Sequence, residues 1–309
     1  MEKQKPPFSI SEKDFPTIYL TADEQSLNGQ RRYLNLMRLD LFALVGGAIL
    51  TAFTVEDELT ARILAIIGAS LLLASLVLTI IITQMNYKKY WYGGRAAAES
   101  IKTLVWRYMT SAEPFANSLT LKEADESFLQ RLRDIIEEQE HLSVSLGNEK
   151  AHNRFITDKM IQVRQASLED RKQSYLICRI EDQRLWYRDK SKRNEKSESN
   201  FFMYTIVAQF LAFISALILI GWPIMPITPT GIFTTIAGAF LVWTQLKQHQ
   251  ELSQSYAVAA HELGLIAEQA RYIKNEQEFG EFVADAENAI SREHTLWLAR
   301  RDQSPLLWK

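Results

Sequence analysis

The residue types that carry out catalysis are present in this sequence but form no catalytic constellation. His261 and Glu262 match the start of a zinc-protease motif, yet the position that should supply the second histidine is Leu265. The histidines show no metal-ligand spacing; they are His141, His152, His249, His261 and His294. These patterns favour neither a zinc enzyme nor another metal site.

Glycine and cysteine usage excludes two further kinds of chemistry. The pairs Gly46-Gly47 and Gly93-Gly94 fit no phosphate-binding loop. The single cysteine, Cys178, excludes an internal disulfide framework and a Cys-rich metal site. A formal net charge of −2 gives no reason to expect nucleic acid, which favours a basic surface. We therefore predict a protein that is not an enzyme, holds no cofactor and binds no nucleic acid.

Polar residues within or beside the apolar stretches are the remaining candidates, and they suggest a path for ions. The acidic turn Glu56-Asp57-Glu58 would form a negative ring in a symmetric oligomer, and such a ring favours cations. The alternative for this turn is a solvated loop. Asp40 either lines an inner vestibule or lies at the level of the lipid headgroups. Gln209 cannot bond back to its own helix as serine and threonine do, so it should face a partner or water.

Small residues recur at helical spacing in the apolar stretches. Such spacing lets helix backbones approach closely in lipid, where packing drives association. The small-residue positions are Ala43, Gly47 and Thr51, then Ala65 with Ala69, Ser70 with Ala74, and Thr234 with Gly238. They serve either packing within one chain or packing between protomers around a pore, where Thr51 would also be a pore candidate.

Four apolar runs must position these residues. Ile63–Thr83 and Phe201–Trp222 contain no charge, whereas Leu41–Val55 and Gly231–Leu246 are shorter. A run of about 20 apolar residues spans a bilayer as a helix, and soluble core helices rarely lack charge over that length. We therefore predict an all-α membrane protein. The expected spans are about 39–55, 62–83, 201–222 and 226–246.

The charges that flank the spans set the predicted topology. Lysines and arginines gather outside the two hairpin turns, whereas the first turn carries three acids and Arg62. The positive-inside rule then places both termini and the central segment in the cytoplasm. Only the two short turns face the other side of the membrane.

The stretches outside the spans are predicted to be helical, without strand signals. Residues 1–25 are polar and contain proline, which indicates a loose N-terminal arm, and residues 116–165 form a cytoplasmic helical connector. Ser167 is a predicted N-cap, and because no proline or glycine follows before Gly221, one helix can run from the cytosol into the third span. The two-span units cover residues 26–115 and 166–309.

An internal repeat relates these two-span units. An apolar stripe at Ala97, Ile101, Leu104 and Tyr108 recurs 162 positions later, at Ala259, Leu263, Ile266 and Ala270. Because both units begin and end on the same side, the repeat is parallel in the membrane, unlike the inverted repeats of many transporters. We therefore predict two parallel-repeat transmembrane helical hairpins with long cytoplasmic helices.

Two blocks of the sequence resemble a known family. The first block contains Trp91-Tyr92, the run RAAAESIKTL from Arg95 to Leu104, Trp106-Arg107-Tyr108 and Ala112-Glu113-Pro114-Phe115. The second contains Ile180-Glu181-Asp182-Gln183-Arg184, Trp186-Tyr187 and Gln248-His249-Gln250-Glu251-Leu252. They resemble the SLATT family, the two-transmembrane effector domains associated with SMODS and SLOG modules in bacterial conflict systems, here in two tandem copies. The resemblance implies an effector that opens or assembles a pore when a partner senses infection.

The residues and the resemblance together predict a homo-oligomeric pore or ion channel of the bacterial inner membrane that acts in antiviral defence. Its expected partners are the lipid bilayer, further copies of this chain and a cytoplasmic sensor protein, because the sequence shows no nucleotide-binding or nucleotide-generating module. The alternative is a non-conducting membrane scaffold whose cytoplasmic helices recruit partners. A small-solute transporter would need a binding site at the membrane midplane, and none is evident in the spans.

Overall fold

The computed structural model describes residues 5–138 and 154–302, with side chains up to Ser291. Helices make up 83% of the structure, and the described residues contain no strand, only an isolated β-bridge between Phe53 and Ile227. The all-helical prediction is therefore confirmed. Part of the predicted connector, residues 139–153 with His141 and His152, lies outside the described residues, as does the side chain of His294.

The helices form two compact units, and each unit combines distant parts of the sequence. The hairpin unit comprises Gln30–Tyr87 and Ser191–Gln254. The helical body comprises Met1–Gly29, Lys88–Lys190 and Ser255–Lys309. Both predicted two-span segments therefore contribute to both units. Spatial packing thus groups the two hairpins with each other and the flanking helices with each other, which a division into consecutive domains does not describe.

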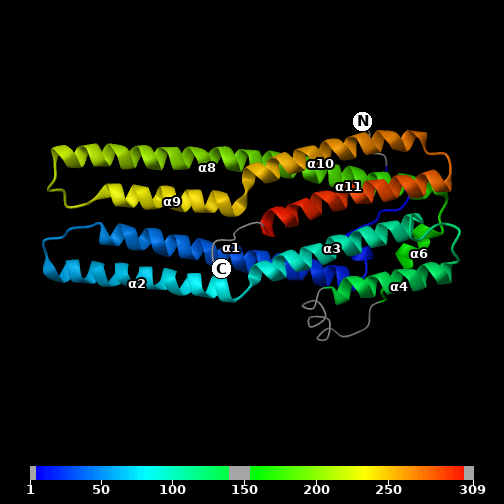
Figure 1. Ribbon diagram of the computed structural model, residues 1–309, viewed down its shortest axis with the longest axis horizontal. Coiled ribbons are helices and arrows are strands. Elements are labelled where there is room, and N and C mark those ends of the chain that lie inside the picture. Colours follow the sequence, from blue (N-terminus) through cyan, green and yellow to red (C-terminus); the bar gives the residue numbers. More distant parts are fainter. Residues whose placement is uncertain (1–4, 139–153, 303–309) are drawn as a thin grey trace. The chain divides into compact units, whose positions relative to one another are not determined.

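Two helical hairpins make up the hairpin unit, each from neighbouring antiparallel helices (Figure 1). The first joins α1 (Thr17–Thr51) to α2 (Glu58–Gln84), and the second joins α8 (Asp182–Gly221) to α9 (Pro229–Lys247). Proline suits the first position of α9 because the N–H that it lacks has no partner inside a helix. The two hairpin turns are hydrogen-bonded to each other. The Thr54 N–H donates to the Pro226 carbonyl at 2.7 Å, and the Thr228 N–H donates to the Ala52 carbonyl at 3.1 Å.

Within the described residues, three helical stretches are long and apolar enough to cross a membrane. They are Thr17–Thr51, Glu58–Thr110 and Leu168–Gly221, and they contain the second predicted span and most of the first and third. The fourth predicted span corresponds to α9, which has 19 residues. By length and apolar composition alone, α9 does not qualify as a membrane span. Large apolar side chains are exposed on the hairpins, including Phe42, Phe202 and Phe213. Exposed apolar surface of this kind is typical of a membrane contact.

The backbone itself shows the internal repeat. α3 (Tyr87–Thr110) follows the first hairpin and α10 (His249–Gln269) follows the second. Each begins directly after a residue in the left-handed conformation, Asn86 with φ 48° and Gln248 with φ 50°. These two residues are 162 positions apart, which is the spacing of the predicted stripe. All four stripe residues of α3 are buried, as are Ala259 and Leu263 of α10 and Ala270 directly after it, so the predicted repeat is confirmed.

The helical body adds shorter helices to α3, α10 and the adjoining parts of α1 and α8. These are α4 (Leu121–Glu137), α6 (Asp158–Arg164), α7 (Leu168–Tyr175), the 3-10 turn Ala270–Tyr272 and α11 (Glu276–Asp302). The Ser167 hydroxyl accepts the Asp170 N–H at 3.2 Å, which confirms the predicted N-cap of α7. A π-helical turn, Leu176–Glu181, joins α7 to α8 without a break, so the predicted long helix is also confirmed.

The prediction of a loose arm over residues 1–25 is wrong from Glu12 onwards, and residues 1–4 lie outside the described residues. A 3-10 turn forms at Glu12–Asp14, α1 already begins at Thr17, and Phe15, Ile18 and Tyr19 are buried in the helical body. On α1, the buried residues Ile18, Tyr19 and Ala22 are spaced as one face of a helix. A segment that is polar on average can therefore still bury a narrow apolar stripe.

Candidate functional site

Asp40, a candidate for an inner vestibule or for the headgroup level, is hydrogen-bonded to the neighbouring helix of its own hairpin. The Ser75 hydroxyl of α2 donates to the Asp40 carboxylate at 2.6 Å. Ser75 is buried and Asp40 is partly buried. A polar contact of this kind between two membrane helices holds them together. Asp40 therefore has a structural role in linking α1 to α2.

Two of the three acids in the first turn have local structural roles. The Asp57 carboxylate caps α2, since it accepts from the Thr60 N–H at 2.8 Å and from the Thr60 hydroxyl at 2.6 Å. Glu58 pairs with Arg62 one helical turn away at 2.5 Å. Glu56 is exposed and makes no ion pair with the described residues. Of the three acids, Glu56 is thus the one whose charge is available to ions at the turn.

Glycines bring α1 and α2 close together. A Cβ atom on Gly68 would lie 2.9 Å from the Thr51 methyl carbon, and Gly47 is buried at the same contact. The Thr51 hydroxyl donates to the Gly47 carbonyl at 2.9 Å, as predicted for threonine in a helix. Ala65 and Ala69 are exposed, so the first of their two alternatives, packing within one chain, does not hold. They lie on the outer face of α2, because Gly68 occupies the inner face, and packing between protomers stays a prediction for them.

The other small and polar candidates are divided between the inside and the outside of the hairpin unit. Ala43 is buried, as packing requires, but a Cβ atom on Gly238 would meet nothing within 4 Å. The packing residue of this part of α9 is instead its neighbour Ala237, which is buried. Gln209 is exposed on α8, and its amide makes no hydrogen bond with the described residues. The prediction that Gln209 faces a partner or water stays a prediction.

His249 is held as a neutral side chain at the base of the second hairpin. Its ring stacks on Phe201, with centroids 6.0 Å apart, and its Nδ1 lies 2.8 Å from the Asn194 side-chain oxygen. Burial and the charge of Lys247 lower the pKa of His249 to about 4. In the described residues no group of three His, Cys, Asp or Glu side chains could hold a metal ion. His249 therefore acts as an aromatic packing residue.

The lowered pKa of His249 predicts a pH effect. Because the folded pKa lies below the ordinary value of 6.5, the neutral ring favours folding above pH 6.5, and this contribution is lost as the pH falls towards 4. NMR titration of the ring should give a midpoint near 4, and Lys247→Gln should raise it by removing a like charge. A midpoint at or above 6.5 in the wild type would contradict the packing seen here.

The helical body contains a buried ion pair that the sequence does not predict. The Glu287 carboxylate of α11 is fully buried and accepts from the Arg179 Nε at 2.9 Å and Nη2 at 2.8 Å. It also accepts from the Tyr175 hydroxyl at 3.0 Å and the Thr103 hydroxyl at 2.7 Å. These donors come from α3, α7 and the π-helical turn. One carboxylate therefore joins four segments, and no local sequence signal marks a pair that is more than 100 positions apart.

A cavity of about 400 Å³ lies beside this ion pair, within the helical body. Its lining includes Arg179, Trp106 and the ion pair Glu12–Lys102, whose atoms are 2.9 Å apart. Arg179 Nη1 and Trp106 Nε1 are buried and lack a hydrogen-bond partner among the described residues. Buried donors of this kind are normally satisfied by an acceptor oxygen, from solvent or from a small molecule. The cavity is thus lined by charged and apolar side chains together, and two of its lining residues each carry a buried donor without a partner among the described residues.

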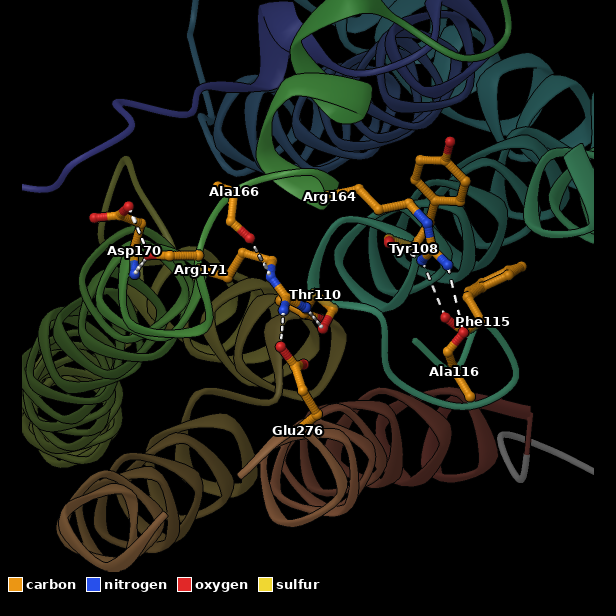
Figure 2. Close-up of polar contacts among 10 residues, drawn as sticks. Tyr108, Thr110, Phe115, Ala116, Arg164, Ala166, Asp170, Arg171 and Glu276 are labelled. Carbon is orange, nitrogen blue, oxygen red and sulfur yellow. Dashed lines mark hydrogen bonds and ion pairs between the residues drawn. The ribbon is translucent and has the colours of Figure 1, made fainter. Parts of the chain in front are cut away.

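Two arginines of the helical body cap the end of α3 (Figure 2). Arg164 Nη1 donates to the carbonyls of Tyr108 at 2.8 Å and Phe115 at 3.0 Å. Arg171 Nη1 donates to the Thr110 carbonyl at 2.9 Å, and its Nη2 pairs with Glu276 of α11. The last carbonyls of a helix lack intrahelical partners and carry partial negative charge, so buried cations stabilise them. This contact fixes α6 and α7 against α3.

The two hairpins and the helical body define an all-helical membrane protein. The family described as SMODS and SLOG-associating 2TM effector domain 3 matches residues 16–172, and the family described as SMODS and SLOG-associating 2TM effector domain 1 matches residues 175–297. The chain therefore belongs to the SLATT family and carries two SLATT domains in tandem. Comparisons with curated proteins and with solved structures returned no match.

The family assignment bears directly on the fourth span. Each matched domain is described as crossing the membrane twice, and the second match contains α8 and α9. α9 is antiparallel to α8 and packs on it, as the ring contact of Phe201 with Phe240 at 6.1 Å shows. The family description therefore supports α9 as the partner span of α8, where length and composition alone do not.

Proposed function

We propose that this protein is a membrane effector of bacterial defence that forms a homo-oligomeric pore or ion channel. The two tandem matches to two-span effector domains carry the proposal. Placement in the inner membrane, with both termini in the cytoplasm, is part of it, as is a cytoplasmic sensor protein that supplies the signal. The proposed activity opens a path for ions and involves no catalytic step.

The hairpin unit supplies two side chains suited to line such a path. Glu56 is exposed at the first turn without an ion pair among the described residues, and Gln209 is exposed on α8. Asp40, Asp57 and Thr51 are engaged by contacts within the first hairpin. In a ring of copies, Glu56 would repeat around the mouth of the pore, where carboxylates attract cations. Glu56 is therefore the residue to test.

Charge reversal at the turn should alter ion selectivity. Proteoliposomes that contain the full chain should pass cations in preference to anions, and Glu56→Lys should reverse that preference by at least several-fold. The reason is that a ring of positive charge repels the ions that the carboxylates attracted. Reversal potentials under a salt gradient measure the effect. Glu56 is a better target than Asp57 or Glu58, since neither a helix cap nor an ion pair is lost with it.

Glu24→Lys provides the matched control, because Glu24 is an exposed acid on α1 within the helical body. It makes the same charge change away from the turn and should leave selectivity unchanged. Identical ion selectivity for Glu56→Lys and Glu24→Lys would show that the turn does not lie at the mouth of the pore. Vesicles that stay tight at high protein content would favour the non-conducting scaffold, and a monomeric mass in detergent would weigh against a ring.

A further inference from the structure

Two apolar ridges face each other in the hairpin unit without closing. The ridge on α1 consists of Leu41, Phe42 and Val45, and the ridge on α9 consists of Ile236, Ala239 and Phe240. Residues at these spacings share one face of a helix. A groove of about 450 Å³ runs between the ridges. Phe42 is 73% exposed, so the groove opens onto the outer surface of the unit.

The groove is held open between two fixed contacts. At one end, the hydrogen bonds of Thr54 and Thr228 join the two hairpin turns. At the other end, the Arg38 guanidinium carbon of α1 lies 5.2 Å from the centroid of the Trp243 ring of α9. These two contacts hold α1 and α9 at a fixed separation between them, so the apolar walls of the groove border its open side and do not pack on each other's surface.

The mouth of the groove is cationic and aromatic. Arg38 and Lys247 both approach the Trp243 ring, at 5.2 Å and 6.0 Å from its centroid. Arg38 is exposed, its guanidinium donates to the Asn35 side chain at 3.2 Å, and it makes no ion pair with any described acid. Tryptophan is enriched at the membrane interface, and arginine extends its charged end to the headgroups there. The mouth of the groove thus carries the residue types that are found beside lipid headgroups.

We propose that this groove binds an acyl chain of an anionic phospholipid, with the lipid phosphate against Arg38. The apolar walls match the acyl chain, and the Arg38 guanidinium, which makes no ion pair with a described acid, matches a negatively charged headgroup. The ring of Trp243 lies where chain and headgroup meet. This site requires the hairpin unit to lie in the membrane but does not require conduction. A tight vesicle would therefore overturn the pore without affecting the lipid site, and the reverse also holds.

Native mass spectrometry of the full chain can test the site. The protein is incubated with equimolar phosphatidylglycerol and phosphatidylcholine and then released from detergent. The wild type should retain phosphatidylglycerol in preference, and Arg38→Gln should lower that preference about fivefold, the effect of one cation near a lipid surface. Ala239→Leu, which fills the groove, should reduce the retention of both lipids.

Matched controls separate the groove from general attraction and from poor folding. Arg31→Gln removes the same charge from an exposed position of α1 outside the groove, and Ala74→Leu adds the same bulk on the exposed face of α2. Both should retain lipid as the wild type does. Equal losses for Arg38→Gln and Arg31→Gln would overturn the proposal. So would an Ala239→Leu variant that dissociates an oligomer while lipid retention is unchanged, since a second copy would then occupy the groove. The two arginine variants decide the question even if Ala239→Leu does not fold.

Discussion

Glu287→Gln should lower the free energy of unfolding of the helical body by about 3–5 kcal/mol. The substitution keeps the size of the side chain but removes its charge, so the buried Arg179 guanidinium loses its counter-ion. Arg179 is 1% exposed and Glu287 is 0% exposed, so both charges are withdrawn from bulk solvent. Removing one member of a buried pair leaves an uncompensated charge, which is why the effect is large.

The loss should appear as a fall of the thermal midpoint on the order of 10 °C, since 1 kcal/mol shifts the midpoint of a unit of this size by about 2–4 °C. Thermal unfolding of the purified chain in detergent measures it. Glu58→Gln is the control, because it makes the same change in a pair whose side chains are 72% and 80% exposed. Such pairs contribute about 0–1 kcal/mol.

A double variant distinguishes the ion pair from simple packing. Arg179→Met combined with Glu287→Met replaces both charges by apolar side chains, so no buried charge remains unpaired. This variant should be more stable than Glu287→Gln, as found where buried pairs are replaced by apolar groups. The single variants Arg179→Met and Glu287→Met complete the comparison. If the double variant loses as much stability as the two single variants together, the side chains are not coupled, and the role assigned to the pair is incorrect.

Gly94→Ala should destabilise the helical body by about 1–3 kcal/mol, although alanine is the better helix former. A Cβ atom at Gly94 of α3 would lie 2.8 Å from the Ala22 carbonyl oxygen and 2.9 Å from the Ser26 nitrogen, both in the backbone of α1. The Ser26 hydroxyl also donates to the Trp91 carbonyl at 2.9 Å across this contact. Because backbone atoms cannot rotate away as a side chain does, the two helices must separate.

Gly264→Ala is the matched control for this prediction. Gly264 lies within α10 of the same helical body, and a Cβ atom there would lie 3.8 Å from the Arg184 side chain, an ordinary contact. Alanine at this position should leave stability unchanged or raise it by up to about 1 kcal/mol. The thermal midpoint should therefore fall for Gly94→Ala and should not fall for Gly264→Ala. A rise for both would show that α1 and α3 do not approach closely at Gly94.

The small-residue candidates show the limit of reading a helix contact from sequence. The sequence identified α2 as a membrane helix with small residues at helical spacing, and both statements hold. It favoured Ala65 and Ala69 for packing, whereas the structure uses Gly68 against Thr51. Several faces of an apolar helix carry small residues, and composition alone does not reveal which face meets the partner. That choice depends on the rotation of one helix about its axis relative to the other.

In the acidic turn, too, the sequence identified the residues but not the contact that each of them makes. The sequence placed three acids together and offered a ring or a solvated loop as alternatives. The structure assigns Asp57 to a helix cap and Glu58 to an ion pair with Arg62, which leaves Glu56 as the candidate. The cap could be predicted, because an aspartate directly before an apolar helix is a common N-cap. The packing of the N-terminal arm was not predicted, because its buried residues Phe15, Ile18 and Tyr19 are separated by polar residues and form no long apolar run.

The sequence by itself determined the hairpins, most of the helices, the repeat at 162 positions and the location in a membrane, because each of these follows from hydrophobic runs and local periodicity. Only the tertiary structure decided which distant residues meet. The Arg179–Glu287 pair, the close approach at Gly94 and the groove between α1 and α9 join positions far apart in the chain. Periodicity states which face of a helix is apolar, but it does not name the helix that will cover that face. That selection is made by shape and charge when the helices pack.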